Sequence, residues 1–215
     1  MIKVYFGPMG SGKTEILIKE YNKIYLKNKT QVFSPKLDNR FGIGNIRGRK
    51  GNQISSVAID NIFEIPNLLK STTKHVFIDE ANFFESAEDL EKNITQADLE
   101  QRRYDSIRLL VELSLEKNID FNIFGLNLTA EMKPYGIMPL AIVFADERHE
   151  LKAECIDCGA EAKYTYYIPG HKTTNVIGAD DYCAVCGACH LKWTKLLNTN
   201  PSKYKKLSDQ LRIKE

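Results

Sequence analysis

Near the start of the chain, the spacing of apolar residues changes from every second position to every third or fourth. Alternation over residues 2–6 predicts a strand. The three- to four-residue period over 15–25 predicts a helix that buries one face. The apolar positions behind these two predictions are Ile2, Val4 and Phe6 in the strand and Leu17, Tyr21 and Ile24 in the helix.

Further short apolar runs predict more strands along the chain. Residues 31–34, 75–78 and 119–125 have strand patterns, and residues 104–117 have a helical one. Strands that alternate with helices are typical of parallel sheets. The sequence therefore predicts an α/β fold with a mostly parallel sheet.

Two polar stretches interrupt this pattern. Residues 36–53 are glycine-rich and cationic, which indicates either a solvated surface loop or a flap beside a phosphate. Residues 85–103 are polar and fit no core element, so we expect a surface helix or an insertion there.

Length and charge restrict the class of protein. At 215 residues the chain is long enough for one α/β domain and a small appendage. Thirty basic residues against 28 acidic ones give a net charge of +2, which indicates no surface dedicated to nucleic acid. No apolar stretch approaches the roughly 20 residues of a membrane span, and no leader is evident. We expect a cytoplasmic protein without a membrane or nucleic-acid partner.

A glycine-rich segment directly follows the first predicted strand and has the form G-x-x-x-x-G-K-T. Its glycines allow turns in which consecutive backbone N–H groups face phosphate oxygens. Lys13 would reach the β and γ phosphates, and the Thr14 hydroxyl would ligate Mg²⁺. The segment predicts a site that binds a nucleoside triphosphate. It consists of Gly7, Pro8, Met9, Gly10, Ser11, Gly12, Lys13 and Thr14.

Two carboxylates follow the strand predicted at 75–78. Asp79 is suited to holding the water shell of a phosphate-bound Mg²⁺. Glu80 would act either as the general base for a substrate hydroxyl or, in an ATPase, as the group that activates water. In open α/β sheets ligands bind at the carboxyl ends of the strands, where this pair lies.

All five cysteines lie between positions 155 and 189. Cys155-x-x-Cys158 has the spacing of a metal-binding knuckle, and such a cluster in a reducing compartment predicts a structural Zn²⁺ site. The second pair is either Cys183 with Cys186 or Cys186 with Cys189, because both have the two-residue gap. Strand-like residues 164–168 lie between the two groups of cysteines.

Taken together, these motifs resemble the thymidine kinase family of the cellular, zinc-containing type, called type II. The resemblance covers most of the chain. It implies a P-loop NTPase-like sheet with helices on both faces and a small zinc-ribbon lasso domain. The matching segments are 7–14, Asp38-x-Arg40, 79–84, 125–127, 133–136, Cys155-x-x-Cys158 and 177–182 with the final cysteines.

This resemblance also implies an activity. Family members transfer the γ-phosphoryl group of ATP to the 5′-hydroxyl of thymidine or deoxyuridine, giving dTMP in nucleotide salvage. They commonly form homotetramers. The loop at about 164–182 would close over the nucleoside as a lasso and read the base mainly with backbone groups.

The resemblance assigns a role to each candidate residue. Glu80 would take the 5′-hydroxyl proton, and Arg40 would neutralise charge on the transferred phosphoryl group. The family register selects Cys186 and Cys189 as the second zinc pair and leaves Cys183 as the alternative ligand. The nucleoside-binding residues implied are Phe83, Tyr135, Val176, Ile177, Gly178 and Tyr182.

The implied domains are a nucleotide-binding body at 1–150 with an insertion at about 85–103, a zinc-binding lasso at 151–193 and a tail at 194–215. The sequence departs from the family at Asn82, usually Gln, at Asn127, usually Asp, and at Ala130, usually aromatic. Loss of that ring would widen the base pocket. The alternatives are a P-loop ATPase whose zinc ribbon binds nucleic acid or protein, and a catalytically weak nucleotide-binding relative.

Overall fold

The computed structural model describes residues 1–24, 27–38, 42–48, 51–85, 95–168 and 182–212. The chain divides into two compact units. The sheet unit contains residues 1–6, 13–127 and 134–150, and the cysteine unit contains residues 7–12, 128–133 and 151–215. The division passes through the glycine-rich segment between Gly12 and Lys13.

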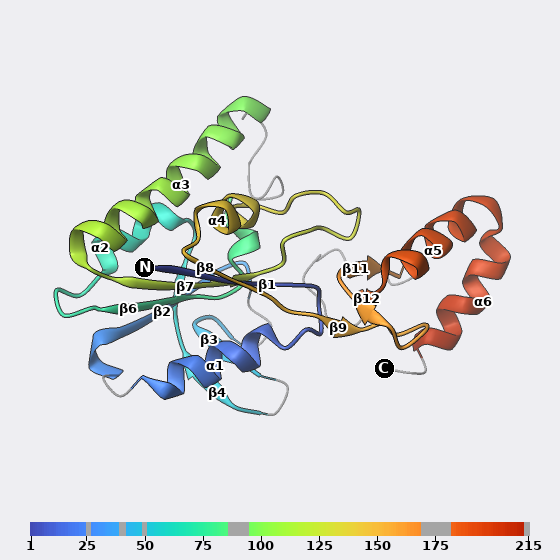
Figure 1. The fold of residues 1–215 in the computed structure, drawn as a ribbon, viewed down its shortest axis with the longest axis horizontal. Coiled ribbons are helices and arrows are strands. Elements are labelled where there is room, and N and C mark those ends of the chain that lie inside the picture. Colours follow the sequence, from blue (N-terminus) through green and yellow to red (C-terminus); the bar gives the residue numbers. More distant parts are fainter. Residues whose placement is uncertain (25–26, 39–41, 49–50, 86–94, 169–181, 213–215) are drawn as a thin grey trace. The chain divides into compact units, whose positions relative to one another are not determined.

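A six-stranded sheet forms the centre of the sheet unit (Figure 1). Every neighbouring pair of strands is parallel, which confirms the predicted parallel α/β fold. The order across the sheet is β5 (Val57–Ile59), β2 (Thr30–Pro35), β6 (His75–Ile78), β7 (Asp120–Gly125), β1 (Ile2–Phe6) and β8 (Glu147–Glu150).

Helices cover both faces of this sheet, as predicted. In Figure 1, α1 (Lys13–Lys23) lies on one face, and α3 (Gln96–Lys117) and α4 (Met138–Phe144) lie on the other. The shorter elements are η1 (Lys27–Lys29), η2 (Ile62–Glu64), α2 (Ile65–Leu68), η3 (Ala81–Phe83) and the hairpin of β3 (Asn45–Arg47) with β4 (Gln53–Ser55).

Helix α3 begins eight residues before the start predicted from the apolar period. Thr95 caps its first turn: the Thr95 hydroxyl accepts from the Asp98 N–H over 3.1 Å, and the Asp98 carboxylate accepts from the Thr95 N–H over 3.3 Å. This reciprocal capping box satisfies two N–H groups that the helix itself leaves without acceptors. The end of the stretch 85–103 is therefore helical, and residues 86–94 lie outside the described part of the chain.

Strands β1, β6 and β7 carry buried aliphatic and aromatic side chains. An aromatic stack also crosses three strands: the Tyr5 ring lies 4.4 Å from the Phe124 ring and 4.4 Å from the His149 ring, centroid to centroid, in nearly parallel planes. The strands are thus fixed beside one another by packing as well as by the ladder of backbone hydrogen bonds.

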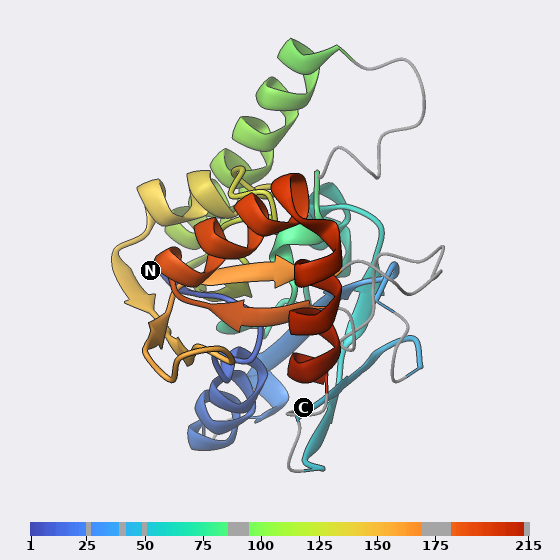
Figure 2. The same cartoon turned by 90° about the vertical axis from the view of Figure 1, so that its right-hand side faces the viewer.

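The described residues of the cysteine unit form short strands and two helices (Figure 2). Strands β11 (Tyr164–Tyr167) and β12 (Tyr182–Val185) pair in an antiparallel register that sets Tyr166 opposite Cys183, and Trp193 on α5 (Gly187–Thr199) is buried. The elements are β9 (Ala153–Glu154), β10 (Glu161–Ala162), β11 (Tyr164–Tyr167), β12 (Tyr182–Val185), α5 (Gly187–Thr199) and α6 (Pro201–Arg212).

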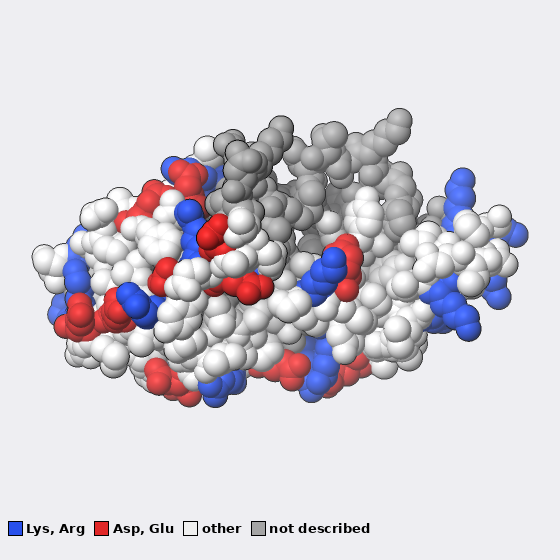
Figure 3. All heavy atoms as spheres, turned by 90° about the horizontal axis from the view of Figure 1, so that it is seen from above, with Lys and Arg blue, Asp and Glu red and all other residues white. Residues whose placement is uncertain are grey.

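In the described part of the chain, no helix has the length and apolar character needed to cross a membrane. Figure 3 shows acidic and basic side chains mixed over the sheet unit on the face in view.

Candidate active site

The glycine-rich segment between β1 and α1 has two positions at which the structure requires glycine. Gly12 has a φ of +81°, a left-handed conformation that a side chain disfavours. At Gly7 the restriction is close approach, because a Cβ there would lie 2.2 Å from the carbonyl oxygen of Leu151. Both positions therefore require glycine for a local steric reason.

Two N–H groups of this segment donate within the protein. The Met9 N–H donates to the Thr165 hydroxyl over 3.0 Å, and the Ser11 N–H donates to the Pro8 carbonyl over 3.3 Å. Thr165 is buried on β11 of the same unit. No sequence pattern predicts that a β11 side chain anchors this segment, since a hydroxyl that accepts from a distant backbone group leaves no spacing pattern.

The acidic pair stands at the carboxyl end of β6. Asp79 is 5% exposed, and its N–H donates to the Phe33 carbonyl over 3.0 Å. Glu80 has φ 47° and ψ 40°, a left-handed conformation that is uncommon for a residue with a side chain. Strand β6 ends here, and the backbone reverses so that η3 can begin. A non-glycine residue in this region is a reason to look for function at Glu80.

Lys13 and Thr14 form the first turn of α1, and Lys13 is 9% exposed. A helix N-terminus that carries a lysine and a hydroxyl suits an anion. The carboxyl ends of β1 and β6 point to the same edge of the sheet, because all its strands are parallel. This is the edge at which ligands bind in open α/β sheets.

Phe83 and Tyr135 are brought together in the sheet unit. Their ring centroids lie 5.8 Å apart with the planes at 80°, an edge-to-face contact. Gly136, with φ +51°, permits this arrangement, because a Cβ there would lie 2.1 Å from the Asn82 carbonyl oxygen. No spacing pattern in the sequence predicts the ring contact, because the two residues lie far apart in the chain.

Asn82 fastens the same region to β7. Its side chain is fully buried, and its Oδ1 accepts from the Leu126 N–H over 2.8 Å. Its Nδ2 has no hydrogen-bond partner among the described residues. Gly125 leaves room for this side chain, since a Cβ there would lie 2.9 Å from the Asn82 Oδ1. The sequence marked Asn82 only as a departure from the family.

Four of the five cysteines lie together. The Sγ atoms of Cys155, Cys158, Cys186 and Cys189 all lie within 4.8 Å of one another, and Cys158 and Cys186 are 3.7 Å apart. Tetrahedral Zn–S bonds of about 2.3 Å separate the sulfurs by about 3.8 Å. The cluster therefore fits a tetrahedral zinc ion.

Cys183 is separate from this cluster. It is buried, and its Sγ donates to the Tyr166 carbonyl over 3.8 Å across the β11–β12 pair. The two-residue gaps alone left the second pair open. The structure favours Cys186 with Cys189, because the Sγ of Cys189 in the first turn of α5 lies in the cluster, whereas Cys183 lies on β12.

The thiols in the cluster have unequal acidity. Burial raises the pKa of Cys155, but backbone N–H groups at Cys186, Cys158 and Asp157 stabilise the thiolate, and the pKa falls to about 7. Burial, followed by the nearby Asp157 and the other thiols, raises the pKa of Cys189. A set of crowded thiols that resists full ionisation is suited to a divalent cation, which stabilises all four thiolates.

Asp157 joins the cluster to α5. Its carboxylate accepts from the Trp193 indole N–H over 2.9 Å and from the Lys192 ammonium over 3.0 Å. These two bonds lower the pKa of Asp157 against the effect of burial. The knuckle between the first two cysteines is thus fixed to the helix that begins at the second pair.

Several predicted residues cannot be placed. Arg40, Val176, Ile177 and Gly178 lie outside the described residues. Tyr182 is the first residue of β12 and stands opposite Tyr167, with ring centroids 5.2 Å apart.

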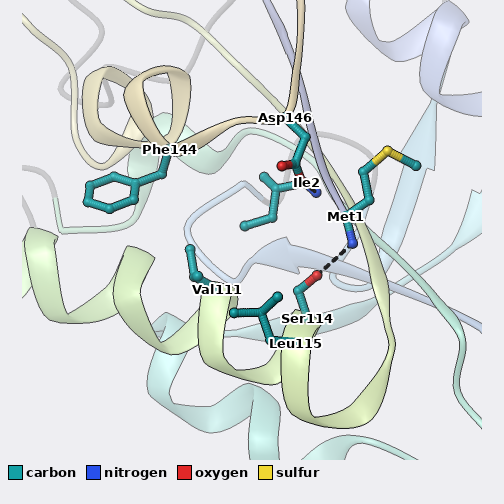
Figure 4. A pocket seen from close by; sticks show the side chains of 7 residues that line it. All are labelled: Met1, Ile2, Val111, Ser114, Leu115, Phe144 and Asp146. Carbon is teal, nitrogen blue, oxygen red and sulfur yellow. Dashed lines mark hydrogen bonds between the residues drawn. The ribbon is translucent and has the colours of Figure 1, made fainter.

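A separate hollow of about 600 Å³ lies in the sheet unit (Figure 4). Among the residues that the structure describes, no predicted site residue lines it. Its lining residues are Met1, Ile2, Val111, Ser114, Leu115, Phe144 and Asp146.

The fold and these residues define the class as an α/β protein with a parallel sheet, a glycine-rich segment before its first helix and four cysteines that could hold a zinc ion. The sequence matches the thymidine kinase family model over residues 1–190, and the chain belongs to this family.

Two similar proteins are named thymidine kinase. The chain is 33% identical over 194 residues to a thymidine kinase of Mycoplasma mobile, a match that covers 89% of this chain and 88% of that protein. It is 30% identical over 190 residues to a thymidine kinase of Pseudothermotoga lettingae, covering 86% of this chain and 92% of that protein.

Proposed function

We propose that this protein is a thymidine kinase that transfers the γ-phosphoryl group of ATP to the 5′-hydroxyl of thymidine or deoxyuridine. The observation that carries this proposal is the family match over residues 1–190, which includes the phosphate segment, the acidic pair and the cysteines. The product from thymidine would be dTMP, used in pyrimidine deoxynucleotide salvage.

The phosphate-binding role falls to residues 7–14. Backbone N–H groups and Lys13 bind phosphate oxygens, while the Thr14 hydroxyl and the Asp79 carboxylate hold the Mg²⁺ and its water shell. Magnesium, when bound, neutralises charge on the phosphates and lowers the barrier to transfer. The burial of Lys13 and Asp79 supports these roles, because charged groups held away from water interact more strongly with a ligand.

Glu80 is the general base. Its carboxylate accepts the proton from the 5′-hydroxyl as the oxygen attacks the γ-phosphorus, and the bond from phosphorus to the bridging oxygen of ADP breaks. The left-handed backbone at Glu80 supports this role, since it turns the residue away from the line of β6. Arg40 stabilises charge on the phosphoryl group in transit.

The nucleoside lies against Phe83 and Tyr135, whose edge-to-face contact supports a fixed aromatic wall for the base. Backbone groups of Val176, Ile177 and Gly178 read the base edge, and Tyr182 meets the sugar. Ala130 gives this chain more space beside the base than an aromatic residue would.

The four-cysteine cluster holds a structural zinc ion, which fixes the two ends of the lasso. The proposal includes the division into a body at 1–150, a lasso domain at 151–193 and a tail at 194–215. It also includes a homotetramer in the cytoplasm, with no membrane or nucleic-acid partner.

A nucleoside panel tests the activity. The purified protein is incubated with labelled ATP, Mg²⁺ and thymidine, deoxyuridine or deoxycytidine, and nucleoside monophosphate and ADP are quantified. We expect monophosphate from thymidine and deoxyuridine, with one ADP for each monophosphate. If ADP forms at the same rate without nucleoside and no monophosphate appears, the protein is an ATPase and the proposal fails.

A further inference from the structure

His190 is a buried histidine for which the proposed function has no role. It lies in the first turn of α5 directly after Cys189 and is 6% exposed. The rings of Tyr164 and Tyr166 meet it edge-on, with centroids 6.0 and 5.0 Å away. A buried imidazole needs hydrogen-bond partners, and here the partners define its orientation.

One partner is a backbone carbonyl 60 residues earlier in the chain. The His190 Nε2 lies 2.9 Å from the Ala130 carbonyl oxygen. Because a carbonyl only accepts, Nε2 carries the proton and donates. The Thr194 hydroxyl lies 3.5 Å from Nδ1. In the tautomer with the proton on Nε2, Nδ1 accepts and this hydroxyl donates to it.

The segment that receives this hydrogen bond is a closed turn in the same unit. The Thr129 N–H donates to the Lys133 carbonyl over 2.9 Å, and the Met132 N–H donates to the Thr129 carbonyl over 3.1 Å. Met132 has a left-handed φ of 60°. The turn is thus internally closed as well as bonded to His190 through Ala130.

The other end of the link is the cysteine cluster. The His190 N–H donates to the Cys186 carbonyl over 3.0 Å, and Cys186 caps α5 with its Sγ 3.5 Å from the Cys189 N–H. The position of His190 is therefore set by the same turn of helix that carries two of the four clustered sulfurs.

We propose that His190 is a positioning residue that fixes the turn 129–133 to the metal-binding cysteines, so that metal binding orders this turn. The consequence for catalysis rests on the proposed function. In the chain, Asn127 comes before the turn and Tyr135 after it, so an ordered turn would restrict the chain that leads to Tyr135. Position 130 is alanine here, whereas the family usually has an aromatic residue. The hydrogen bond from His190 to the Ala130 carbonyl would hold the turn in place of the packing of that ring.

The first experiment needs no turnover. Hydrogen exchange of segment 128–133 is followed by mass spectrometry in the full chain, zinc-loaded and after chelation, for the wild type, His190→Phe and His190→Gln. Phenylalanine keeps the ring but has no donor, whereas glutamine keeps an N–H donor at a similar reach. Leu191→Ala, at a neighbouring position that is 66% exposed, is the matched control.

We expect exchange of 128–133 to quicken by about 3- to 10-fold in zinc-loaded His190→Phe, the equilibrium equivalent of one net hydrogen bond. The glutamine variant and the Leu191→Ala control should exchange like the wild type. Chelation should quicken the wild-type turn, and it should add little in His190→Phe because the link is already broken. Zinc content is measured in every sample.

Steady-state kinetics form the second arm. If the nucleoside lies beside this turn, His190→Phe should raise the KM for thymidine by about 3- to 10-fold and leave kcat within about 2-fold, because binding is lost equally in the ground and transition states. His190→Gln should restore the KM. A merely destabilised enzyme would instead lose active protein, and kcat would fall without a change in KM.

Several outcomes overturn the proposal. The first is seen in the wild type alone: after chelation, segment 128–133 keeps its exchange rate while residues 183–199 exchange faster. This result would show that the metal does not order the turn. Zinc-loaded His190→Phe with wild-type exchange at the turn also contradicts it. If His190→Phe does not hold zinc, the exchange of segment 128–133 in the chelated wild type and in His190→Gln still tests the proposal. A protein without kinase activity that shows the expected exchange pattern would refute the proposed function and leave the link standing.

Discussion

The two units are stabilised in different ways. In the sheet unit, the described residues form a cluster of 20 buried side chains, all apolar, on a parallel sheet. In the cysteine unit, the corresponding cluster has nine, three of them cysteines. Small modules that bury little apolar surface commonly need a metal or disulfides to fold. The difference indicates that one unit depends on hydrophobic burial, whereas the other depends on ligation.

Removal of the metal should produce the largest effect and should affect one unit. Structural zinc contributes about 10 to 16 kcal/mol of apparent folding free energy in small modules. In Cys155→Ser we expect loss of zinc and of amide protection in β11, β12 and α5, while β1, β6 and β7 stay protected. Metal analysis and hydrogen exchange measure the two quantities.

The fifth cysteine supplies the matched control for that experiment. Cys183→Ser should keep its zinc, because the Cys183 Sγ bonds to the Tyr166 carbonyl and is not part of the four-sulfur cluster. Retained zinc in Cys189→Ser together with lost zinc in Cys183→Ser would contradict the ligand set.

A cavity in the sheet core should destabilise the sheet unit and leave the cysteine unit intact. Phe121 lies on β7 with no exposed surface, and Phe-to-Ala substitutions in cores cost about 3 to 5 kcal/mol. We expect the sheet unit of Phe121→Ala to unfold at lower urea concentration while the zinc content stays the same. Tryptophan fluorescence reports on Trp193 in the cysteine unit, and amide exchange of β6 reports on the sheet.

Leu115→Ala is the matched control, because this side chain on α3 is 78% exposed and should change the stability by less than about 0.5 kcal/mol. If both units of Phe121→Ala lose protection at the same urea concentration, the two behave as one cooperative core and the comparison fails.

Loss of phosphoryl transfer can be separated from loss of the metal and from loss of the sheet core. Glu80→Gln should lower kcat by about 10² to 10⁴, the usual contribution of a positioned base. ATP affinity, unfolding midpoints and zinc content should be unchanged, because the amide has the same shape. Glu116→Gln, on the exposed side of α3, is the control. A kcat equal to that of the wild type would remove Glu80 from the mechanism.

Prediction from the sequence was accurate where burial is extreme. The strands at 2–6 and 75–78 agree with β1 and β6 residue for residue, because both consist mainly of buried apolar side chains. Strand β8 was missed. Its sequence, Glu147–Glu150, is polar, and as an edge strand it is held by backbone pairing to β1 and by the Lys3–Glu147 ion pair at 2.9 Å.

The site showed a similar limit. The cysteines, the glycine-rich segment and the acidic pair are local in sequence, so their spacing reveals them. The hydrogen bonds from Met9 to Thr165 and from His190 to Ala130 each join a side chain to a distant backbone atom. A backbone N–H or carbonyl is present at almost every residue, and therefore no residue pattern marks its partner.

The start of α3 is an intermediate case, because a signal existed in the sequence. Thr95 and Asp98 have the capping-box spacing, but the turns they begin are polar apart from Ala97 and Leu99, so the apolar period alone placed the start at residue 104. This cap offers the mildest test of the comparison, since it lies in the sheet unit and is exposed.

Thr95→Ala should destabilise the sheet unit by about 1 kcal/mol, the usual cost of losing an N-cap oxygen, and should quicken amide exchange over residues 96–102. Thr95→Ser keeps the oxygen and should behave like the wild type within a few tenths of a kcal/mol. Unchanged exchange in Thr95→Ala would mean that burial of Leu99, and not the cap, determines where the helix begins. Zinc content should stay at the wild-type value in both variants, because the effect of the cap is local to the first turn of α3, whereas metal retention depends on the four sulfurs.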